Sequence, residues 1–410
     1  MTETVERTDD ATRLPASQRL WWLAVAGIFV ASRIVTTVLM LLFARVQGQS
    51  DWSAPHPIYR VFANFWDGRW YEIIATYGYP TTLQSSGGHI SENAWAFMPV
   101  YPFAARLLMT ITNAPWEVAG ITISVAAGLG SAYLFYRLMQ PRLGHGRALF
   151  AVAVFCAGPT SPLFQVTYAE SLGYFLLLLV LVYWTEKRWI PLLPSILFLA
   201  FTRPAGLALA AAFGLVLIVR LLKRRTIPLP RREALRLGGL TVYSGLLGLA
   251  WPAIAWFVTG VPKAYTDTEL AWRAGYVGYG GLKPFAAWFQ GLHWWLGHLG
   301  FGATAASVWG TLATIALMLG FLALFLIPAV RRLGLVVCAW LAGYGVYILA
   351  VFFPQSSTFR ILSPMFPLAG ALAVPRRWWY RVTVLVLCVG GQVAWLAGMW
   401  WIVPPDWTPP

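Results

Sequence analysis

The chain has 410 residues, of which 59% are hydrophobic and only 11% charged, and its mean hydropathy is +0.64. Soluble domains carry about 25% charged residues, so this composition indicates an all-α polytopic membrane protein and excludes an ordinary soluble domain. The formal net charge of +15 does not indicate a nucleic-acid partner, because most basic residues lie in short gaps between apolar runs, where they act as topology signals.

The apolar runs predict about eleven transmembrane helices in one domain, residues 20–403. Residues 1–19 are polar and of mixed charge, and we expect them to form a cytoplasmic tail. The run at 20–44 is about 25 residues long, which suits a retained first helix better than a cleaved signal peptide. Two runs, 189–201 and 361–374, are short for a full crossing and are expected to be tilted, broken or extended. The ten apolar runs that follow the first one lie at roughly 116–138, 148–163, 166–185, 189–201, 205–222, 237–259, 305–329, 333–353, 361–374 and 382–403.

The segment 95–112 is apolar but differs from these runs. Pro99 and Pro102 interrupt it and Arg106 lies inside it. Because proline removes a helical hydrogen bond and arginine is costly inside a membrane, we interpret the segment as a re-entrant or interfacial helix.

The distribution of basic residues predicts the orientation. With a cytoplasmic N-terminus, 20 of the 30 lysines and arginines fall on the cytoplasmic side. The two longest connecting stretches, 45–115 and 260–304, and the tail 404–410 then lie outside. Chemistry is therefore expected on the outer face, beside the lipid.

The stretch "FWDGRWY" in the first outer loop holds an acid among aromatic residues. Residues 57–77 fit one amphipathic helix, with Asp67 on its polar face and an aromatic face directed to lipid. The polar arc consists of Arg60, Asn64, Asp67 and Tyr71, and the opposite side of Ile58, Phe62, Phe65, Trp66 and Ile73. Asp67 either pairs with Arg60 on a solvated face or acts as a general base toward a sugar hydroxyl. Gly68 is interpreted as leaving room for substrate beside the carboxylate.

Four further charged residues lie where outer loops and apolar runs meet. Glu92 could orient an acceptor or be a solvated loop residue. Glu170 begins an apolar run, and an acid at membrane depth usually lines a cavity or finds a partner. Arg203 and Arg360 could hold a lipid phosphate, anchor at the interface or pair with Glu170.

Arg33 lies about 13 residues into the first helix and is a candidate because a deep arginine usually pairs or faces water. The three cysteines lie inside apolar runs, which favours packing over disulfide or metal chemistry.

Several motifs occur in an order that resembles one family. They are "FWDGRWYEIIATYGY", "AFMPVYP", "TYAESLGYFLLL", "TRPAG" and "FRILSPMFPL", spread over residues 32–368. This pattern is similar to the PIG-V-like mannosyltransferases, relatives of the second mannosyltransferase of GPI-anchor synthesis, and most closely to bacterial members.

The resemblance implies a GT-C-type bundle and an inverting glycosyltransferase in the plasma membrane, active on its extracytoplasmic face. It implies a polyprenyl-phosphate-mannose donor and a glycolipid, lipoglycan or protein acceptor. No cofactor is expected, and no metal is required, because a lipid phosphate paired with cations is a good leaving group and the sequence has no DxD motif. Asp67 and Glu92 are the catalytic candidates. The expected substrate-binding residues are Arg33, Tyr71, Glu170, Arg203 and Arg360. Two alternatives stay open: a flippase for lipid-linked saccharides and a noncatalytic assembly subunit.

Overall fold

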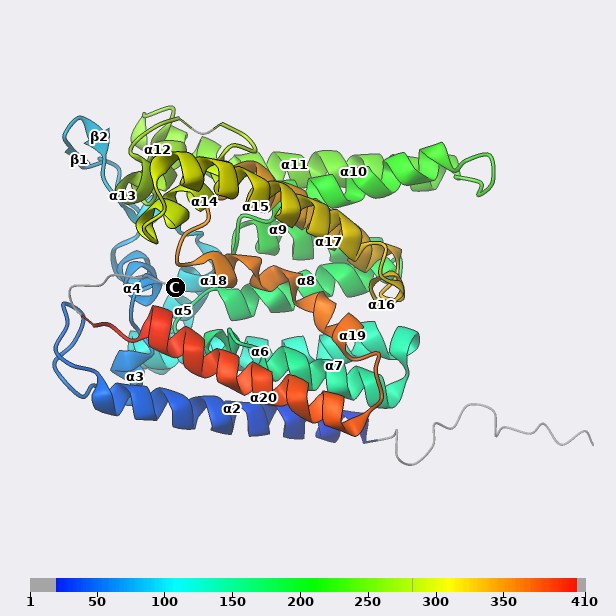
Figure 1. Cartoon of the computed structure of the whole chain (residues 1–410), viewed down its shortest axis with the longest axis horizontal. Helices are drawn as coiled ribbons and strands as arrows, with labels where there is room; N and C mark the ends of the chain where they lie inside the picture. Colours follow the sequence, from blue (N-terminus) through cyan, green and yellow to red (C-terminus); the bar gives the residue numbers. More distant parts are fainter. Residues whose placement is uncertain (1–19, 282, 404–410) are drawn as a thin grey trace, which may run out of the picture.

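The computed structural model describes residues 20–281 and 283–403, and the regular secondary structure of these residues is helical apart from one short hairpin (Figure 1). The tails predicted at 1–19 and 404–410 lie outside the described residues. Five described helices are long and apolar enough to cross a membrane: α2 (Trp21–Val46), α6 (Trp116–Leu143), α11 (Arg231–Thr259), α15 (Ala303–Leu324) and α20 (Trp378–Trp395), which the π-helical turn η5 (Leu396–Trp400) extends. The prediction of an all-α membrane protein is confirmed at this level, whereas eleven crossings stay a prediction.

Six further helices are apolar but shorter. They are α5 (Val100–Thr112), α7 (His145–Ala157), α8 (Glu170–Thr185), α9 (Trp189–Ala200), α10 (Gly206–Leu222) and α17 (Leu335–Val351).

The remaining elements are short helices, helical turns and one hairpin. They are α3 (Tyr59–Phe62), α4 (Asp67–Tyr77), β1 (Ser85–Ser86), β2 (His89–Ile90), η2 (Ala94–Ala96), η3 (Ser161–Gln165), α12 (Ala264–Ala271), α13 (Ala274–Val277), α14 (Ala287–His298), α16 (Pro328–Arg331), α18 (Thr358–Leu362), η4 (Ser363–Leu368) and α19 (Ala369–Leu372).

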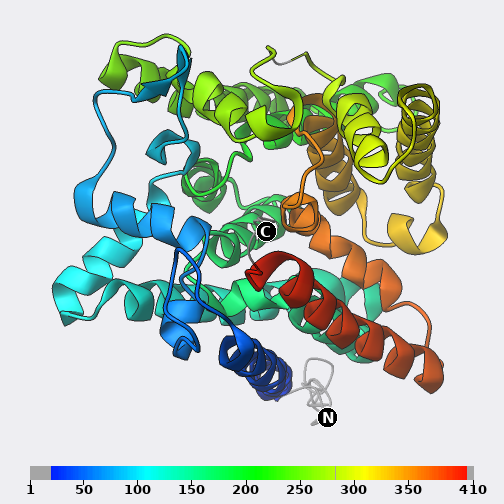
Figure 2. The same cartoon turned by 60° about the vertical axis from the view of Figure 1, so that its left-hand side comes forward.

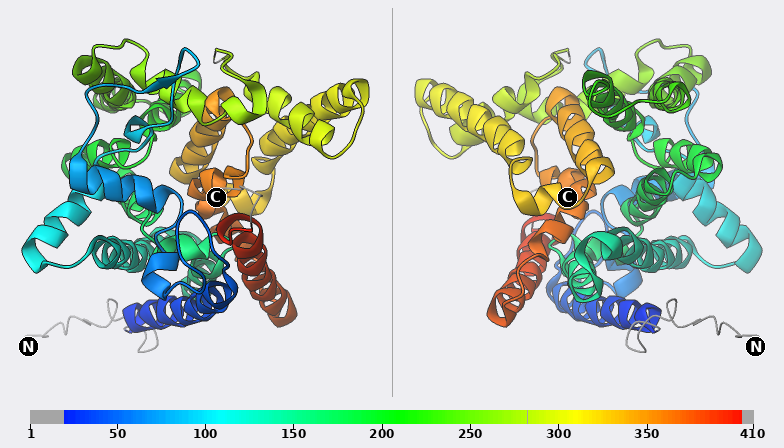
Figure 3. Two further views of the ribbon diagram at one scale, coloured as in Figure 1. Left: turned by 90° about the vertical axis from the view of Figure 1, so that its left-hand side faces the viewer. Right: turned by 90° about the vertical axis from the view of Figure 1, so that its right-hand side faces the viewer.

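The long helices lie side by side along the longest axis of the molecule (Figure 1). One end carries α3, α4, α12, α13 and the hairpin, and the other carries α16 and the connection from α10 to α11. Figure 2 turns the first end toward the viewer, with the blue α4 region and the yellow-green α12 region around it. Both ends are seen in Figure 3.

The two long connecting stretches contact each other at the first end. The Asn93 side chain donates to Thr268 Oγ1 over 2.7 Å, and the His89 ring stacks on Tyr279 with 3.9 Å between centroids. Their common location agrees with the prediction that both stretches lie on one side.

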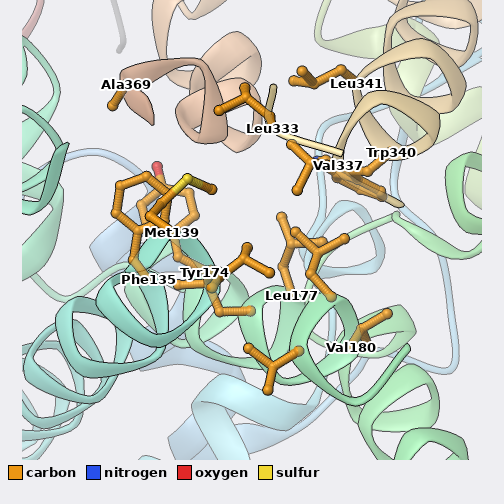
Figure 4. Packing of buried hydrophobic residues seen from close by; sticks show 14 of the residues in the cluster. Phe135, Met139, Tyr174, Leu177, Val180, Leu333, Val337, Trp340, Leu341 and Ala369 are labelled. Carbon is orange, nitrogen blue, oxygen red and sulfur yellow. The ribbon is translucent and has the colours of Figure 1, made fainter. Parts of the chain in front are cut away.

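The main core fills the space between α6, α8 and α17. Phe135 and Tyr174 face Trp340 and Val337 across this space, with Leu177 between them (Figure 4). These side chains are buried, so the hydrophobic effect ties together helices that are far apart in the sequence.

The prediction of a single amphipathic helix at 57–77 is wrong. The chain forms α3 and α4 with a break between them, where Trp66 has a φ of 55°. Phe62, Phe65 and Trp66 are buried in the protein and do not face lipid. They pack beside Trp400, whose indole donates to the Phe62 carbonyl over 3.0 Å. The apolar residues that the pattern assigned to the membrane surface therefore pack in the protein core, against residues near the C-terminal end of the described chain.

Two other segments break at prolines. The run 361–374 continues α18 into η4 and α19, in a stretch that contains Pro364 and Pro367. The segment 95–112 contains η2 and the 13-residue α5, with Pro99 at its N-cap. Proline cannot donate in a regular helix, so both breaks follow from the sequence.

Candidate functional site

A cavity of about 440 Å³ lies among the helix ends at the α4 and α12 end of the bundle. Residues of α4, α8, α11, α12, α17 and α18 line it, together with the connection between α9 and α10. Its wall combines charged side chains with a large apolar part that includes Leu177, Leu247, Trp251 and Ile348. Such a mixture suits a ligand with a polar head and an apolar body.

Four of the predicted site residues meet at this cavity. Arg360 Nη1 pairs with Asp67 Oδ2 and lies 3.2 Å from Glu170 Oε1. Arg203 Nη1 lies 3.1 Å from the same Glu170 oxygen. Asp67, Glu170, Arg203 and Arg360 therefore form a continuous cluster of alternating charge, drawn from four separate segments. The earlier pairing of Asp67 with Arg60 is wrong, because Arg60 is exposed on α3.

The local backbone fixes the position of Asp67. This residue begins α4 directly after the break at Trp66, whose positive φ is uncommon for a non-glycine residue. The Asp67 amide donates to the Tyr168 hydroxyl over 3.1 Å, and the Arg360 guanidinium lies over the Tyr168 ring. Such a conformation costs about 1–3 kcal/mol, and it persists here because packed aromatic side chains hold both sides of the break.

Glu170 is the first residue of α8 and is almost fully buried. Its Oε2 atom has no hydrogen-bond partner among residues 20–281 and 283–403. Arg203 reaches it across Gly173, where an added Cβ would stand 2.9 Å from Arg203 Cγ. The absence of a side chain at Gly173 thus lets the arginine stem lie against α8.

The electrostatic surroundings of Asp67 suit a proton acceptor. Burial raises the pKa of Asp67, and the positive charge and hydrogen bond of Arg360 oppose this shift. A carboxyl with a raised pKa holds a proton more strongly than a surface aspartate does. General bases work best when their pKa lies near the working pH, so the shift is in the useful direction.

Tyr71 also lies at the cavity, one helical turn after Asp67, and its ring is buried. Glu92 does not line the cavity and is exposed. Partial burial and the negative charge of Asp67 raise the pKa of Glu92. The structure therefore brings Tyr71 into the site and leaves Glu92 beside it.

Arg33 is not part of this cavity. Its guanidinium donates to the carbonyls of Cys156 and Ser161 and to Gln165 Oε1 at 2.8–3.0 Å. It lies over the rings of Phe29 and Phe164. Arg33 therefore links α2 to α7 and η3. It is a deep arginine with partners inside the protein, as expected, but it does not lie at the cavity as a substrate-binding residue would.

The sequence interpretation missed the contribution of α12. Tyr265, Glu269 and Arg273, from this helix and the residues just after it, all line the cavity. Burial raises the pKa of Glu269 to about 7, despite opposing effects of Tyr265 and Arg203. The signal was an acid and an arginine four residues apart in "TELAWR", a spacing that places both on one side of a helix.

No family model matches this sequence, and no curated protein matches it.

Proposed function

We propose that the protein is an inverting membrane glycosyltransferase, which transfers a sugar from a polyprenyl phosphate to a hydroxyl group of an acceptor. The observation that carries this proposal is the position of Asp67 at a cavity that combines arginines with an apolar wall. Mannose as the sugar follows from the resemblance alone, as does a glycolipid, lipoglycan or protein acceptor. A site on the extracytoplasmic face of the plasma membrane follows from the resemblance and from the distribution of basic residues.

Asp67 is the proposed base. Its Oδ2 atom faces Arg360, whereas no hydrogen bond to Oδ1 is found among the described residues. Oδ1 can therefore take the proton of an acceptor hydroxyl. The hydroxyl oxygen attacks the anomeric carbon, the bond from that carbon to the phosphate oxygen breaks, and the electron pair leaves with the phosphate. One such displacement inverts the anomeric centre, so a β-linked donor gives an α-linked product.

The apolar part of the cavity supports a lipid-linked donor. Leu177, Leu247, Trp251 and Ile348 offer a surface for a prenyl chain beside the charged cluster. The leaving phosphate is stabilised by positive charge, which arginine supplies through directed hydrogen bonds. This route requires no metal ion.

Sugar transfer by purified protein tests the proposal. In nanodiscs, we expect transfer of radiolabelled mannose from polyprenyl phosphomannose, and Asp67→Asn should lower turnover about 100-fold or more, since asparagine accepts no proton at neutral pH. Asp51→Asn is the matched control, because Asp51 lies in the same outer stretch, is exposed and lines no part of the cavity.

Near-normal transfer by a well-folded Asp67→Asn variant would assign Asp67 a structural role only. Movement of a lipid-linked saccharide across vesicles without any sugar transfer would favour the flippase alternative. The absence of both activities in the wild-type protein would favour an assembly subunit.

A further inference from the structure

Three arginines line the cavity, and their partners differ. Arg203 and Arg360 are paired with Glu170 and Asp67. Arg273 has no carboxylate within ion-pair distance among residues 20–281 and 283–403. It is therefore the cavity arginine whose charge is left uncompensated by the described part of the chain.

The Arg273 side chain is buried, with 7% of its surface exposed. One of its terminal nitrogens donates to the Gly280 carbonyl. Its Nε atom is buried and has no hydrogen-bond partner within the described ranges, and the same holds for the indole nitrogen of the preceding Trp272. Two neighbouring donors that are withdrawn from water and left without acceptors mark a place where an acceptor group is missing.

An acid is close in sequence but does not pair with this arginine. Glu269 precedes Arg273 by four residues, yet no ion pair joins them in the structure. Burying an arginine without a counter-ion is costly, and proteins usually provide either an acid or a bound anion. Residues 20–281 and 283–403 supply no acid to Arg273, so a bound anion is a second way to compensate its charge.

We propose that Arg273 is the anion-binding residue of the cavity and that its ligand is the phosphate group of a prenyl phosphate. The planar guanidinium can present two parallel N–H groups to phosphate oxygens. The apolar wall formed by residues such as Leu247 and Trp251 favours a phosphate that carries a hydrocarbon chain over free phosphate. This inference rests on the proposed function and moves the phosphate contact from Arg203 and Arg360, whose charges the buried acids already neutralise, to Arg273.

Direct binding measurements test the assignment without relying on catalysis. Purified protein is titrated with a short-chain prenyl phosphate, with the corresponding prenol and with inorganic phosphate. Arg273→Gln should weaken prenyl phosphate binding about 10-fold or more and leave prenol binding unchanged. Arg273→Lys should restore part of the affinity, since it keeps the charge but not the fork. Lys263→Gln is the control, because Lys263 is an exposed cation beside α12 that does not line the cavity.

Each result has a defined meaning. Equal prenyl phosphate affinity in wild type and a folded Arg273→Gln variant overturns the assignment, even if sugar transfer is observed. Equal, Arg273-dependent affinities for inorganic and prenyl phosphate overturn the lipid part of the proposal. Arg273-dependent binding of prenyl phosphate by a protein that transfers no sugar supports the assignment and rejects the proposed function.

Discussion

At the scale of single residues, the charged side chains at the cavity fall into two groups: those that pair with one another and those that do not. Arg360 contacts both Asp67 and Glu170, and Arg203 adds a second contact to Glu170. These interactions compensate two acids that would otherwise be buried without partners, which is costly. The acids on α4 and α8 are thereby kept in a fixed arrangement. Helix α12 contributes Glu269, and the connection to α13 contributes Arg273; these two residues make no ion pair with each other.

The raised pKa of Glu269 predicts that the stability of the folded protein depends on pH. The folded protein holds the Glu269 proton more tightly than the unfolded chain, because burial raises the pKa from 4.5 to about 7. Stability should therefore fall as pH rises from about 4.5 to 7, and the full penalty should persist above pH 7. Glu269→Gln should melt higher than wild type at pH 8 and at the same temperature at pH 4. The side chain faces the water-accessible cavity, so we expect about 1 kcal/mol, or about 2 °C.

Thermal denaturation in detergent at the two pH values measures this difference. Glu269→Asp is the control, because it keeps a titrating carboxyl and should keep the pH dependence. A Glu269→Gln variant that follows the wild-type melting temperature at both pH values would contradict the assignment of this penalty to Glu269.

Much of the charged cluster could be predicted from the sequence, because an ionised group inside apolar sequence must find a partner or face water. Asp67, Glu170, Arg203 and Arg360 follow this rule and meet at one cavity. Arg33 follows the same rule in a different way, since backbone carbonyls and Gln165 satisfy its guanidinium. Charge in an apolar run thus predicts partnership but does not distinguish a structural partner from a ligand.

At the scale of helices, the break between α3 and α4 decides what the first outer stretch presents. Periodicity alone predicted one continuous helix, because α3 and α4 both have helical patterns. The break depends on Trp66 and on contacts with Trp400, at the other end of the chain, which a local pattern does not contain. Asp67 is consequently the first residue of a helix and lies buried at the cavity, whereas the prediction placed it in the middle of one long helix.

The start of α4 also changes the role of Gly68. A Cβ at this position would clash with the Thr167 hydroxyl and would stand 2.8 Å from Asn64 Oδ1, so Gly68 permits close packing and does not leave room for substrate. Asn64 Oδ1 already accepts from Thr167 and from the Trp116 indole. We therefore expect Gly68→Ala to destabilise the protein by about 1–3 kcal/mol through overpacking.

The melting temperature of Gly68→Ala measures this effect. Gly27→Ala is the matched control, because Gly27 is also helical and has no atom within 4 Å of an added Cβ. That control should be neutral or more stable by about 0.5–1 kcal/mol, as alanine favours helix. Equal stability of Gly68→Ala and wild type would show that the Asn64 and Thr167 side chains can move aside.

At the scale of the whole molecule, the interior explains why hydropathy overstated several helices. The predicted runs 148–163 and 166–185 correspond to α7, η3 and α8, and helix α8 begins only at Glu170. Many of the intervening residues are apolar and buried, so the stretch resembles membrane-spanning sequence; these are Leu163, Phe164, Val166, Tyr168 and Ala169. They instead connect α7 to α8, with Pro159 and Pro162 interrupting the helix, and Tyr168 contacts Asp67 and Arg360 of the charged cluster. Hydropathy along the sequence does not distinguish residues that are buried in the protein interior from residues that face lipid, because both are apolar.

The arrangement of the two ends of the bundle gives a topology prediction. Single cysteines at Ser86, Lys263 and Thr226 can be labelled, because all three positions are exposed. In a background with Cys156, Cys338 and Cys388 replaced by alanine, a membrane-impermeant reagent should label the first two from outside intact cells. Thr226→Cys should react only after the cells are opened, because it lies in the basic connection at the opposite end.

Labelling of Ser86→Cys and Thr226→Cys from the same side would contradict the orientation. Outer labelling of Thr226→Cys alone would invert it and move the proposed reaction to the cytoplasmic face.

The link between Asp67 and Arg360 also has a consequence for how the protein is made. The two residues are 293 positions apart, and a ribosome adds about 5–20 residues per second, so about 15 to 60 seconds of translation separate them. Once Glu170 has been made, the nascent chain contains both acids but not yet the arginine that joins them. Glu170 can pair with Arg203 soon after both are made, whereas Asp67 must stay hydrated or protonated until the segment that carries Arg360 enters the membrane. Formation of the contact between Asp67 and Arg360 is therefore a late step of biogenesis, and a chain that stops before Arg360 lacks the cation that pairs with Asp67.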